Sequence, residues 1–390
     1  MAGLEVEDVK SVGTDTVLDI EITPNRPDCL NIIGLAREIS AITAKKLILP
    51  VIKSYKTTTI NHFSVTVENK KDCPLYSATF IKNVTISSTE PRLKERLGAI
   101  GINSINNAVD ITNFVLMEQG QPLHAFDADK IEGGKIIVRR AKAGESIVTL
   151  DGIERKLDPS VLVIADAKRP IAIAGIMGGK ATEITAATRN ILLESAQFDM
   201  GLVRQASRKL GLKSDSSYRF ERGIWADGVI QGANRAVDLL ITATKASFAG
   251  RIDRHSIDKI KPIHILISVE AIERLLGTRS IAAQVTSSLT RLALTVVADK
   301  KNGFKVTVPS FRGDLRQNVD LIEEIARIIG YDRLQVSFPH IQVLNIAPNA
   351  RPRQLRRQIS DVLLSNGYDE TVTFSLISHK DLKASNLSHL

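Results

Sequence analysis

The apolar residues of this chain follow two spacings, and the two alternate along the sequence. Residues 15–23 place Leu18, Ile20 and Ile22 at every second position, which predicts a strand with one buried face. Other short runs are apolar nearly throughout and predict buried strands: 76–86, 135–140, 161–165, 171–174 and 191–194. Because helical patterns lie between these runs, we expect a chain of mixed α and β structure.

Apolar residues at helical spacing predict a second set of elements. The expected helices are 28–42, 91–99, 203–210, 227–246, 269–276, 282–292, 320–329 and 351–365. For the first of these we expect Asp28 as the N-cap, Ile39 on the buried stripe and Glu38 in solvent. Pro91 is well placed to open the second helix, and Gly211 to end the third.

The segment 113–127 combines candidate chemistry with an interruption of regular structure. Its apolar residues run into Gly-Gln-Pro at 120–122, where a regular element is expected to end. We therefore expect His124 and Asp127 on an irregular segment just after a rigid element, which is where functional residues concentrate. A lone histidine at a turn is more often a packing residue, so this segment does not decide its own role.

Turn residues organise the remainder of the chain. Asp151 and Gly152 lie between two strand-like runs and predict a hairpin with a type I′ turn over 148–157. Strands at 263–267 and 304–308, together with three of the helices above, predict a smaller α/β unit. After the last helix, a strand is expected over 370–376.

Length and composition are those of a soluble globular protein with two or three domains. The chain has 390 residues, of which 43% are hydrophobic and 24% are charged. Cys29 and Cys73 are its two cysteines, which provide no disulfide framework and favour a reducing cytoplasm. We expect no membrane-spanning segment, because charges and a proline interrupt the longest apolar run at 161–179. We also expect no signal peptide, because Glu5, Glu7 and Asp8 lie where its apolar region would start.

The charge balance is a weak indication of a partner. Lys and Arg number 52 against 43 acidic residues, which gives a net charge of +9 and a pI near 9.4. A basic chain suits a polyanion such as RNA, although basic enzymes without nucleic-acid partners also exist.

Eight motifs occur in a fixed order along the chain. They are ITPNRPDCL with GLAREI (22–39), AVDITNFVLMEQGQPLHAFD (108–127), LDGIERKL (150–157), IAIAGIMGG (171–179), ILLESAQFD (191–199), SDSSYRFERG (214–223), VPSFRGDLRQNVDLIEEIARIIGYD (308–332) and NGYDETVTFSL (366–376). Together they resemble the β subunit of bacterial phenylalanyl-tRNA synthetase, and the resemblance covers nearly the whole chain.

The resemblance implies an α+β multidomain chain. A strand–helix unit is expected over 1–60, and a mixed-sheet tRNA-editing domain of the B3/B4 type over 61–250. A small α/β, winged-helix-like domain of the B5 type follows over 260–340, and the start of a catalytic-like domain over 345–390. The family's OB-fold tRNA-binding domain and its C-terminal anticodon-contacting domain have no counterpart in this sequence, so we expect a shortened β subunit.

Members of this family hydrolyse tyrosine that has been wrongly attached to phenylalanine tRNA, and the resemblance assigns recognition of that tyrosine to Glu194. A hydrophobic site built for phenylalanine rejects an added hydroxyl only about a hundredfold. A buried carboxylate selects the hydroxyl positively, since it accepts a hydrogen bond from tyrosine and stays unpaired with phenylalanine. The alternative is that Glu194 is a solvent-exposed residue at the end of a strand, with no role in a site.

Other residues of the editing pocket follow from the same resemblance. They are His124, Asn113, Thr112, Gly175, Gly178, Ser214 and Ser216. His124 and Asn113 are expected near the terminal adenosine and the ester, where a positioned water would attack with no covalent nucleophile. The two glycines permit close approach of the backbone to a ligand.

Two positions depart from the family pattern. Many members have alanine where this chain has Ser216, so an extra hydroxyl enters the pocket wall. Many also have arginine where this chain has Asn103, which weakens an expected phosphate contact.

Four acidic residues near the end of the smaller unit are candidates for a metal site. Asp314, Asp320, Glu323 and Glu324 offer oxygen ligands without cysteine or histidine, which suits Mg²⁺. The resemblance assigns these positions to a magnesium ion shared with the α subunit. The alternative is a capping box, with Asp320 as N-cap and Glu323 as the third helical residue.

The leading interpretation is therefore the β subunit of an α2β2 class II phenylalanine–tRNA ligase, in a shortened form that carries the editing hydrolase. In that family, ATP and phenylalanine are used by the α subunit, so this chain alone is not expected to aminoacylate. Phenylalanine tRNA and the α subunit are the expected partners, with no membrane. The alternatives are a non-catalytic tRNA-binding or assembly module, and an editing hydrolase that acts in trans.

Overall fold

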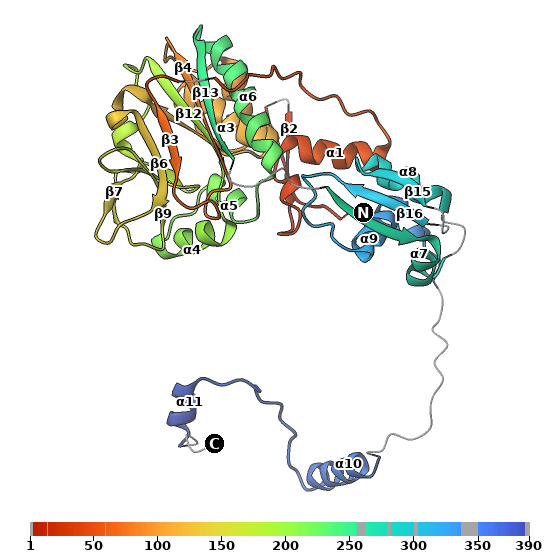
Figure 1. Ribbon diagram of the computed structural model, residues 1–390. Coiled ribbons are helices and arrows are strands. Elements are labelled where there is room, and N and C mark those ends of the chain that lie inside the picture. Colours follow the sequence, from red (N-terminus) through yellow and green to blue (C-terminus); the bar gives the residue numbers. More distant parts are fainter. Residues whose placement is uncertain are drawn as a thin grey trace. The chain divides into compact units, whose positions relative to one another are not determined.

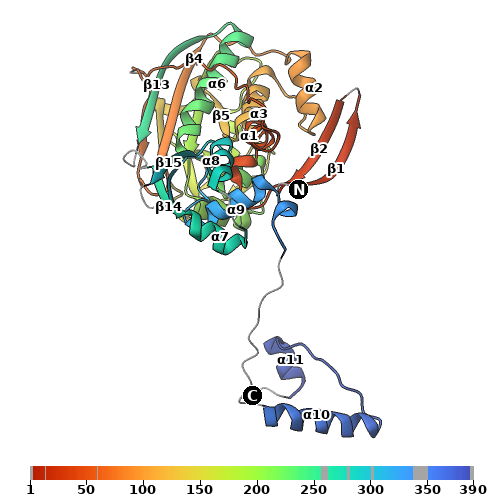
Figure 2. The same cartoon turned by 90° about the vertical axis from the view of Figure 1, so that its right-hand side faces the viewer.

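The protein is described by a computed structural model that covers residues 3–13, 15–58, 60–255, 262–278, 282–299, 303–336 and 350–386. The chain divides into two compact units, residues 1–336 and 337–390. Figures 1 and 2 show the elements of both units in two views. The expected mixed α and β fold class is confirmed.

The chain opens with an antiparallel hairpin of β1 (Glu5–Val12) and β2 (Asp15–Glu21). Both strands are largely exposed. A 3-10 turn at Pro27–Cys29 then leads into α1 (Ile32–Thr43).

The structure corrects two expectations about α1. Asn31, and not Asp28, caps this helix by accepting the N–H of Gly34 at 2.7 Å. Ile39 is 57% exposed, whereas Glu38 is buried. Helical spacing predicted a buried Ile39 and an exposed Glu38. It could not reveal that the side chains packed against this face of α1 are charged.

A four-stranded antiparallel sheet lies at the centre of residues 60–255, in the order β13–β4–β12–β5. Its strands are β4 (Leu75–Lys82), β5 (Leu123–Asp127), β12 (Asn190–Gln197) and β13 (Ser247–His255). One face of the sheet packs on α3 (Asn107–Gln119) and α6 (Ala226–Thr244), which lie beside it in Figure 1. Alternate side chains of these strands therefore pack on two sides, one set against the helices and the other in the core between the two sheets.

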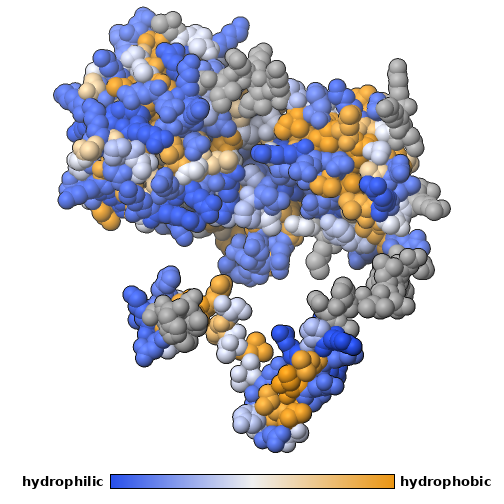
Figure 3. Space-filling model, turned by 60° about the horizontal axis from the view of Figure 1, so that its bottom comes forward, coloured by the Kyte–Doolittle hydropathy of each residue, from blue (hydrophilic) through white to orange (hydrophobic). Residues whose placement is uncertain are grey.

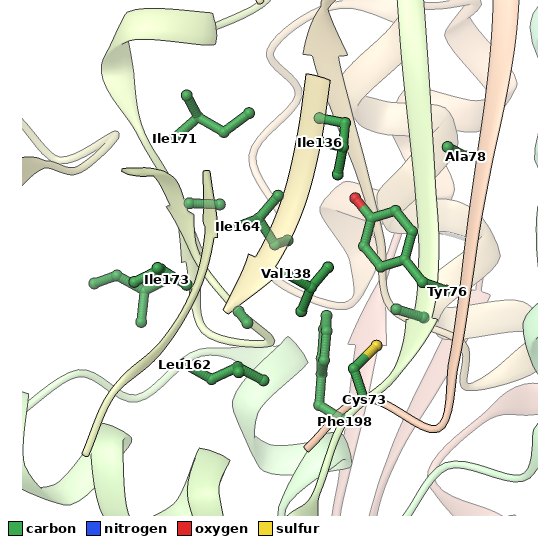
Figure 4. Packing of buried hydrophobic residues seen from close by; sticks show 14 of the residues in the cluster. Cys73, Tyr76, Ala78, Ile136, Val138, Leu162, Ile164, Ile171, Ile173 and Phe198 are labelled. Atoms are coloured by element: carbon green, nitrogen blue, oxygen red, sulfur yellow. The ribbon is translucent and has the colours of Figure 1, made fainter. Parts of the chain in front are cut away.

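A second sheet has the order β11–β10–β9–β6–β3. Its strands are β3 (Ser64–Val67), β6 (Lys135–Arg140), β9 (Leu162–Ala165), β10 (Pro170–Ile173) and β11 (Met177–Gly178). The pairing of β3 with β6 is parallel and the others are antiparallel, so the sheet is mixed. The two sheets share one buried core (Figure 4). Tyr76 of β4 and Phe198, which directly follows β12, pack there with Val138 and Ile164 of the second sheet.

Shorter elements connect and cover these sheets. They are α2 (Pro91–Ala99), α4 (Met200–Leu210), α5 (Asp215–Phe220), β7 (Ser146–Val148) and β8 (Glu154–Lys156). Strands β7 and β8 form the expected hairpin, but residues 149–153 separate them, so the expected two-residue turn is wrong. Asp151 accepts hydrogen bonds from the Thr149 hydroxyl and the Ile153 N–H, which stabilises this longer turn.

Residues 262–336 form the smaller α/β unit. A three-stranded antiparallel sheet has the order β14–β16–β15, with β14 at Ile263–Ser268, β15 at Thr295–Asp299 and β16 at Gly303–Val308. The helices are α7 (Val269–Leu276), α8 (Ala282–Arg291) and α9 (Asn318–Ile329). Their buried apolar faces share one core with the sheet. The strands and helices expected here are present, and β15 is an additional strand.

The second unit contains α10 (Ala350–Ser365) and α11 (His379–Ala384). An exposed apolar stripe on α10 is visible in Figure 3 and includes Leu355, Ile359 and Val362. The strand expected over 370–376 is wrong: no strand occurs there among the described residues, and Phe374 is 91% exposed. A strand needs a neighbour for its backbone groups, and none is described beside this segment.

The expected domain boundaries at 260, 340 and 345 fall outside the described residues. Within the described ranges, no helix combines the length and the apolar content needed to cross a membrane.

Candidate active site

Two ionisable side chains, the buried Glu194 and the half-buried His124, lie side by side on neighbouring strands. Glu194 on β12 is the direct register partner of His124 on β5, so both project from the same face of the sheet. Two residues further along, Leu192 and Phe126 belong to the core between the two sheets. The expectation of an irregular segment at His124 is therefore wrong, since this residue and Asp127 both lie in β5.

A pocket of about 360 Å³ includes both side chains in its wall. All eight residues expected around the editing site line it: Thr112, Asn113, His124, Gly175, Gly178, Glu194, Ser214 and Ser216. They come from α3, β5, the turn around β11, β12 and α5, which are far apart in the sequence. The structure therefore brings the whole expected set together, while their individual roles in binding and catalysis stay predictions.

Helix α3 contributes residues of its first two turns, Val109, Thr112 and Asn113, to the pocket wall. Asn106 caps its start by accepting the N–H groups of Ala108 and Val109, and Gly120 ends it with a φ of 77°. That left-handed conformation favours glycine, so the chain turns into β5 just before His124. Thr112 donates its hydroxyl to a backbone carbonyl of the same helix. The Asn113 side chain is only half-buried and has no protein hydrogen bond among the described residues, so its amide is available to a ligand.

Glycine is required at positions 175 and 178. A Cβ atom at Gly178 would lie 2.3 Å from Cε1 and 2.5 Å from Nε2 of His124. Gly175 has a φ of 71°, and a Cβ there would lie 2.9 Å from the ring of Phe220. The backbone of this turn therefore approaches the histidine ring more closely than any other residue type would permit.

Helix α5 is tied to the same turn through Ser214. The Ser214 hydroxyl accepts the N–H of Ser217 in a capping box and donates to the carbonyl of Ile176 at 2.8 Å. Ser216, which is half-buried, lies in the first turn of this helix and lines the pocket. Its hydroxyl has no protein partner in the described part of the chain, so it adds a free polar group to the wall.

Burial sets the protonation of the two central groups. Burial raises the pKa of Glu194 to about 8, and its side chain is 6% exposed. Burial also lowers the pKa of His124 to about 4. The Nε2 atom of His124 is buried without a hydrogen-bond partner. The Glu194 carboxyl lines the pocket and accepts no hydrogen bond from any described residue. Near neutral pH both groups are therefore largely uncharged and unpaired, which is costly unless a ligand partners them.

Sequence reasoning missed several residues of this pocket. Glu183, which is half-buried, adds a second acidic side chain, and Leu150 covers the pocket from the β7–β8 hairpin. Leu150 is held there because its N–H donates to the carbonyl of Gly178 at 3.0 Å. The LDG motif at 150–152 was the available signal, but nothing local indicates that a hairpin turn reaches this site.

Comparison with known proteins follows the same division of the chain. Residues 72–245 match the family model of the B3/4 domain, and residues 265–331 match that of the tRNA synthetase B5 domain. The pocket lies in the first match, and the four acidic residues lie in the second.

Curated relatives match over almost the whole chain. Phenylalanine–tRNA ligase β subunits from Moorella thermoacetica and Syntrophus aciditrophicus are 44% and 43% identical, over 94% and 93% of this chain and 46% of each relative. A third, from Geobacter metallireducens, is 41% identical over 96% of this chain and 47% of its own length. The chain is a relative of the phenylalanine–tRNA ligase β subunits. The expected resemblance is thus confirmed, and the chain spans about half the length of the curated relatives it matches.

The four candidate magnesium ligands of the B5 domain are largely occupied by other contacts. Arg312 binds Asp314 through two hydrogen bonds of 2.7 and 2.9 Å, and it also donates to Glu324. Asp320 accepts the N–H of Gln317 at 2.7 Å. Glu323 is exposed, whereas the adjacent Glu324 is buried. As arranged in this chain, the four carboxylates do not fit a metal cage, and magnesium here stays a prediction.

The capping alternative holds in a modified form. The capping box of α9 pairs Gln317 as the N-cap with Asp320 as the third helical residue. The expected assignment of Asp320 as N-cap and Glu323 as its partner is wrong by one turn, because the helix begins at Asn318.

A buried network of alternating charges joins α1 to the B5 domain. Its members, in order of contact, are Asp28, Arg26, Glu38, Arg327, Glu324, Arg312 and Asp314. Glu38 accepts from Arg26 and from Arg327 at 2.5 Å each. Burial alone would raise the pKa of Glu324, but its hydrogen bonds and ion pairs with Arg312 and Arg327 lower that pKa to about 2.

One group in this network resembles a metal site without being one. Ligand atoms of Asp28, Cys29 and Glu38 lie within 4.8 Å of one another. The Arg26 guanidinium, however, donates to Asp28 at 2.9 Å, to Glu38 at 2.5 Å and to the Cys29 sulfur at 3.2 Å. An arginine therefore already supplies the positive charge that these three groups surround.

Proposed function

We propose that this chain is the B3/4 and B5 portion of a phenylalanine–tRNA ligase β subunit, and that its pocket hydrolyses tyrosine esterified to phenylalanine tRNA. The observation that supports this most is the Glu194 carboxyl, which is buried in the pocket wall with no protein partner among the described residues. A buried polar group without a partner is costly, and a ligand hydroxyl would supply the missing hydrogen bond.

Selection of tyrosine follows from that cost. The carboxyl oxygen of Glu194 accepts a hydrogen bond from the phenol of tyrosine whether or not the carboxyl carries its own proton. Phenylalanine would leave the same group desolvated and unpaired, a difference of about 1–3 kcal/mol. The apolar wall, which includes Ile164, Ala172 and Ile173, suits the aromatic ring of either amino acid.

We assign the hydrolytic step to a bound water that attacks the ester carbonyl. An imidazole whose pKa is lowered to about 4 is a weak base at neutral pH. His124 is therefore proposed to orient the ester or the terminal ribose by hydrogen bonding through its unpartnered Nε2. Asn113 is proposed to bind the same end of the substrate, and Gly178 to leave room for the histidine ring.

The partners proposed for the chain are those of the ligase. They are the α subunit, in an α2β2 assembly, and phenylalanine tRNA in the cytoplasm. Activation of phenylalanine with ATP is proposed to belong to the α subunit, so this chain alone would not aminoacylate. Magnesium bound between the subunits would engage Glu323 most easily, since that carboxylate is exposed.

Deacylation of mischarged tRNA tests the proposal. The chain is mixed with Tyr-tRNA and, separately, with Phe-tRNA carrying the same tRNA body, and release of the amino acid is followed with time. We expect release of tyrosine well above the rate without protein, and little release of phenylalanine. Glu194→Ala should lower the rate for tyrosine about tenfold to a hundredfold, which corresponds to the hydrogen bond lost.

Two controls make the result specific. Glu183→Ala removes the other acidic side chain of the pocket and should leave the preference for tyrosine in place. His124→Ala should slow hydrolysis without abolishing the preference, because selection is assigned to Glu194. Equal release of tyrosine and phenylalanine by the unmodified chain, or no release of either, would refute the proposal.

A further inference from the structure

A second hollow lies beside the pocket and differs from it in charge. It has a volume of about 740 Å³ and is lined mainly by residues of α4, of α5 and of the segments that follow these helices, together with Pro24. Its polar wall includes Arg204, Arg208, Lys213, Tyr218 and Arg222. The pocket that contains Glu194 is mainly apolar, so the two hollows suit different parts of one ligand.

The cations of this groove are available. Arg204 and Arg208 are one turn apart on the exposed face of α4, and Lys213 follows in the segment after that helix. None of the three forms an ion pair within the described part of the chain. The two acids that also line the groove are engaged, since Asp215 pairs with Arg219 at 3.2 Å and Glu221 with Arg222 at 2.7 Å.

An exposed aromatic ring accompanies these cations. Tyr218 is 42% exposed, and the guanidinium of Arg222 lies 3.5 Å from the centre of its ring. The Nε atom of Arg222 is buried and has no hydrogen-bond partner in the described residues. A flat stack of this kind, next to free cations, matches the surfaces on which proteins hold the bases and phosphates of single-stranded nucleic acid.

The groove and the pocket share a wall. Ser214 lines both hollows, and its hydroxyl joins the start of α5 to the turn at Ile176. A chain of nucleotides lying in the groove would therefore end next to the pocket, where an esterified amino acid could enter.

We infer that this groove binds the single-stranded 3′ end of the aminoacylated tRNA and directs its terminal ester into the pocket. Arg204, Arg208 and Lys213 bind backbone phosphates, and Tyr218 with Arg222 stacks against a base. This inference rests on the proposed function for its substrate, but the binding it requires is measured separately.

Binding of a short RNA to the full chain tests the cations. The probe is a 5′-fluorescein-labelled single-stranded RNA that ends in CCA, and its anisotropy is followed from about 50 to 300 mM salt. In the variant that combines Arg204→Gln, Arg208→Gln and Lys213→Gln, we expect at least tenfold weaker binding at low salt. The slope of log affinity against log salt should be shallower by about 2, roughly 0.7 for each phosphate contact.

A matched control keeps the same loss of net charge. Lys53→Gln, Lys56→Gln and Lys305→Gln remove three exposed lysines outside the groove, and affinity should stay within about twofold of the unmodified chain. For the stack, Tyr218→Ala should weaken binding about tenfold, whereas Tyr218→Phe keeps the ring and should retain affinity.

The outcomes separate this inference from the proposed function. Unchanged RNA affinity and salt slope in the triple groove variant would overturn the inference, even where Glu194-dependent release of tyrosine persists. Loss of α-subunit binding with intact RNA affinity would likewise overturn it, because the groove would then be a protein interface. Absence of tyrosine release with groove-dependent RNA binding would instead count against the proposed hydrolysis alone.

Discussion

Two regions of this molecule bury glutamate to the same extent and treat it in opposite ways. Glu194 in the pocket is 6% exposed, and Glu324 in the charge network is 5% exposed. The pKa of Glu194 is raised to about 8, whereas that of Glu324 is lowered to about 2. The difference lies in the neighbours, since two arginines donate to Glu324 and no described residue donates to Glu194.

The comparison distinguishes a structural acid from a candidate functional one. In the network, each buried charge is satisfied within the protein, and the result holds α1 against the B5 domain. In the pocket, no protein group offsets the cost of removing the Glu194 carboxyl from water. A ligand that hydrogen-bonds to this carboxyl would offset that cost. Burial alone therefore does not identify a site, but burial without a partner does indicate one.

The largest effect is expected where the paired region is broken. Glu38→Gln leaves Arg26 and Arg327 buried with a neutral group between them, and we expect the free energy of unfolding to fall by about 3–5 kcal/mol. Urea denaturation followed by circular dichroism measures this change. Glu323→Gln, on the exposed side of α9, is the control and should change stability by less than about 0.5 kcal/mol. A loss below about 1 kcal/mol for Glu38→Gln would mean that the network contributes little.

A smaller loss is expected when the pocket is overfilled. In Gly178→Ala the new methyl group would overlap the His124 ring, so ring or backbone must shift, at a cost of about 1–3 kcal/mol. Tyrosine release should fall together with stability. Gly98→Ala in α2 is the matched control, because a Cβ there meets no atom within 4 Å, and stability should be unchanged or slightly higher. Equal behaviour of the two variants would contradict the close packing at His124.

The pH dependence of stability distinguishes the unpartnered pair from the network. Between its ordinary pKa of 4.5 and about 8, folded Glu194 holds a proton that the unfolded chain has lost, so stability falls as pH rises. His124 has the opposite effect. Between about pH 4 and 6.5 the unfolded chain holds a proton that folded His124 has lost, so stability rises with pH. The two slopes oppose each other below pH 6.5, and only that of Glu194 continues above it.

We therefore expect Glu194 to account for a loss of about 2 kcal/mol in the free energy of unfolding between pH 6.5 and 8. Glu194→Gln should remove this loss, as measured by urea denaturation at the two pH values. The same variant should leave a rise in stability between pH 4.5 and 6.5, which His124→Gln then abolishes. Parallel pH profiles for the unmodified chain and Glu194→Gln would show that Glu194 is not raised in pKa.

The smallest expected effect concerns the wall between the pocket and the groove. Ser214→Ala removes the cap of α5 and the hydrogen bond to the Ile176 carbonyl, and we expect a loss of about 1 kcal/mol. Thermal unfolding at fixed pH detects it. Ser214→Thr keeps the hydroxyl and should retain most of the stability, so a similar loss in both variants would place the cause in packing and not in the hydrogen bonds.

Much of the local structure was readable from the sequence because its causes are local. Glycine after an apolar run ends α3, α4 and α7 at or beside the expected residue, and Pro91 opens α2. The eight residues that line the pocket were also expected from the sequence. The family resemblance predicted that they lie together, and their spacing along the chain did not.

The errors share a different cause. The N-cap of α1, the burial of Glu38 and the start of α9 depend on partners from distant parts of the chain. The same is true of His124, which the Gly-Gln-Pro break suggested was irregular but which pairs with β12. A strand forms where its backbone groups find a neighbour, and for 370–376 no such neighbour is described.

The sequence by itself determined the class of the chain, the ends of most helices and the set of residues worth examining. Only the tertiary structure decided which buried acids are satisfied. It set Glu194 beside His124 with no hydrogen bond from any described residue. It also placed Glu38 between two arginines that lie 12 and 289 residues away along the chain. The charge state of a buried group depends on what surrounds it in space, and a linear pattern does not contain that information.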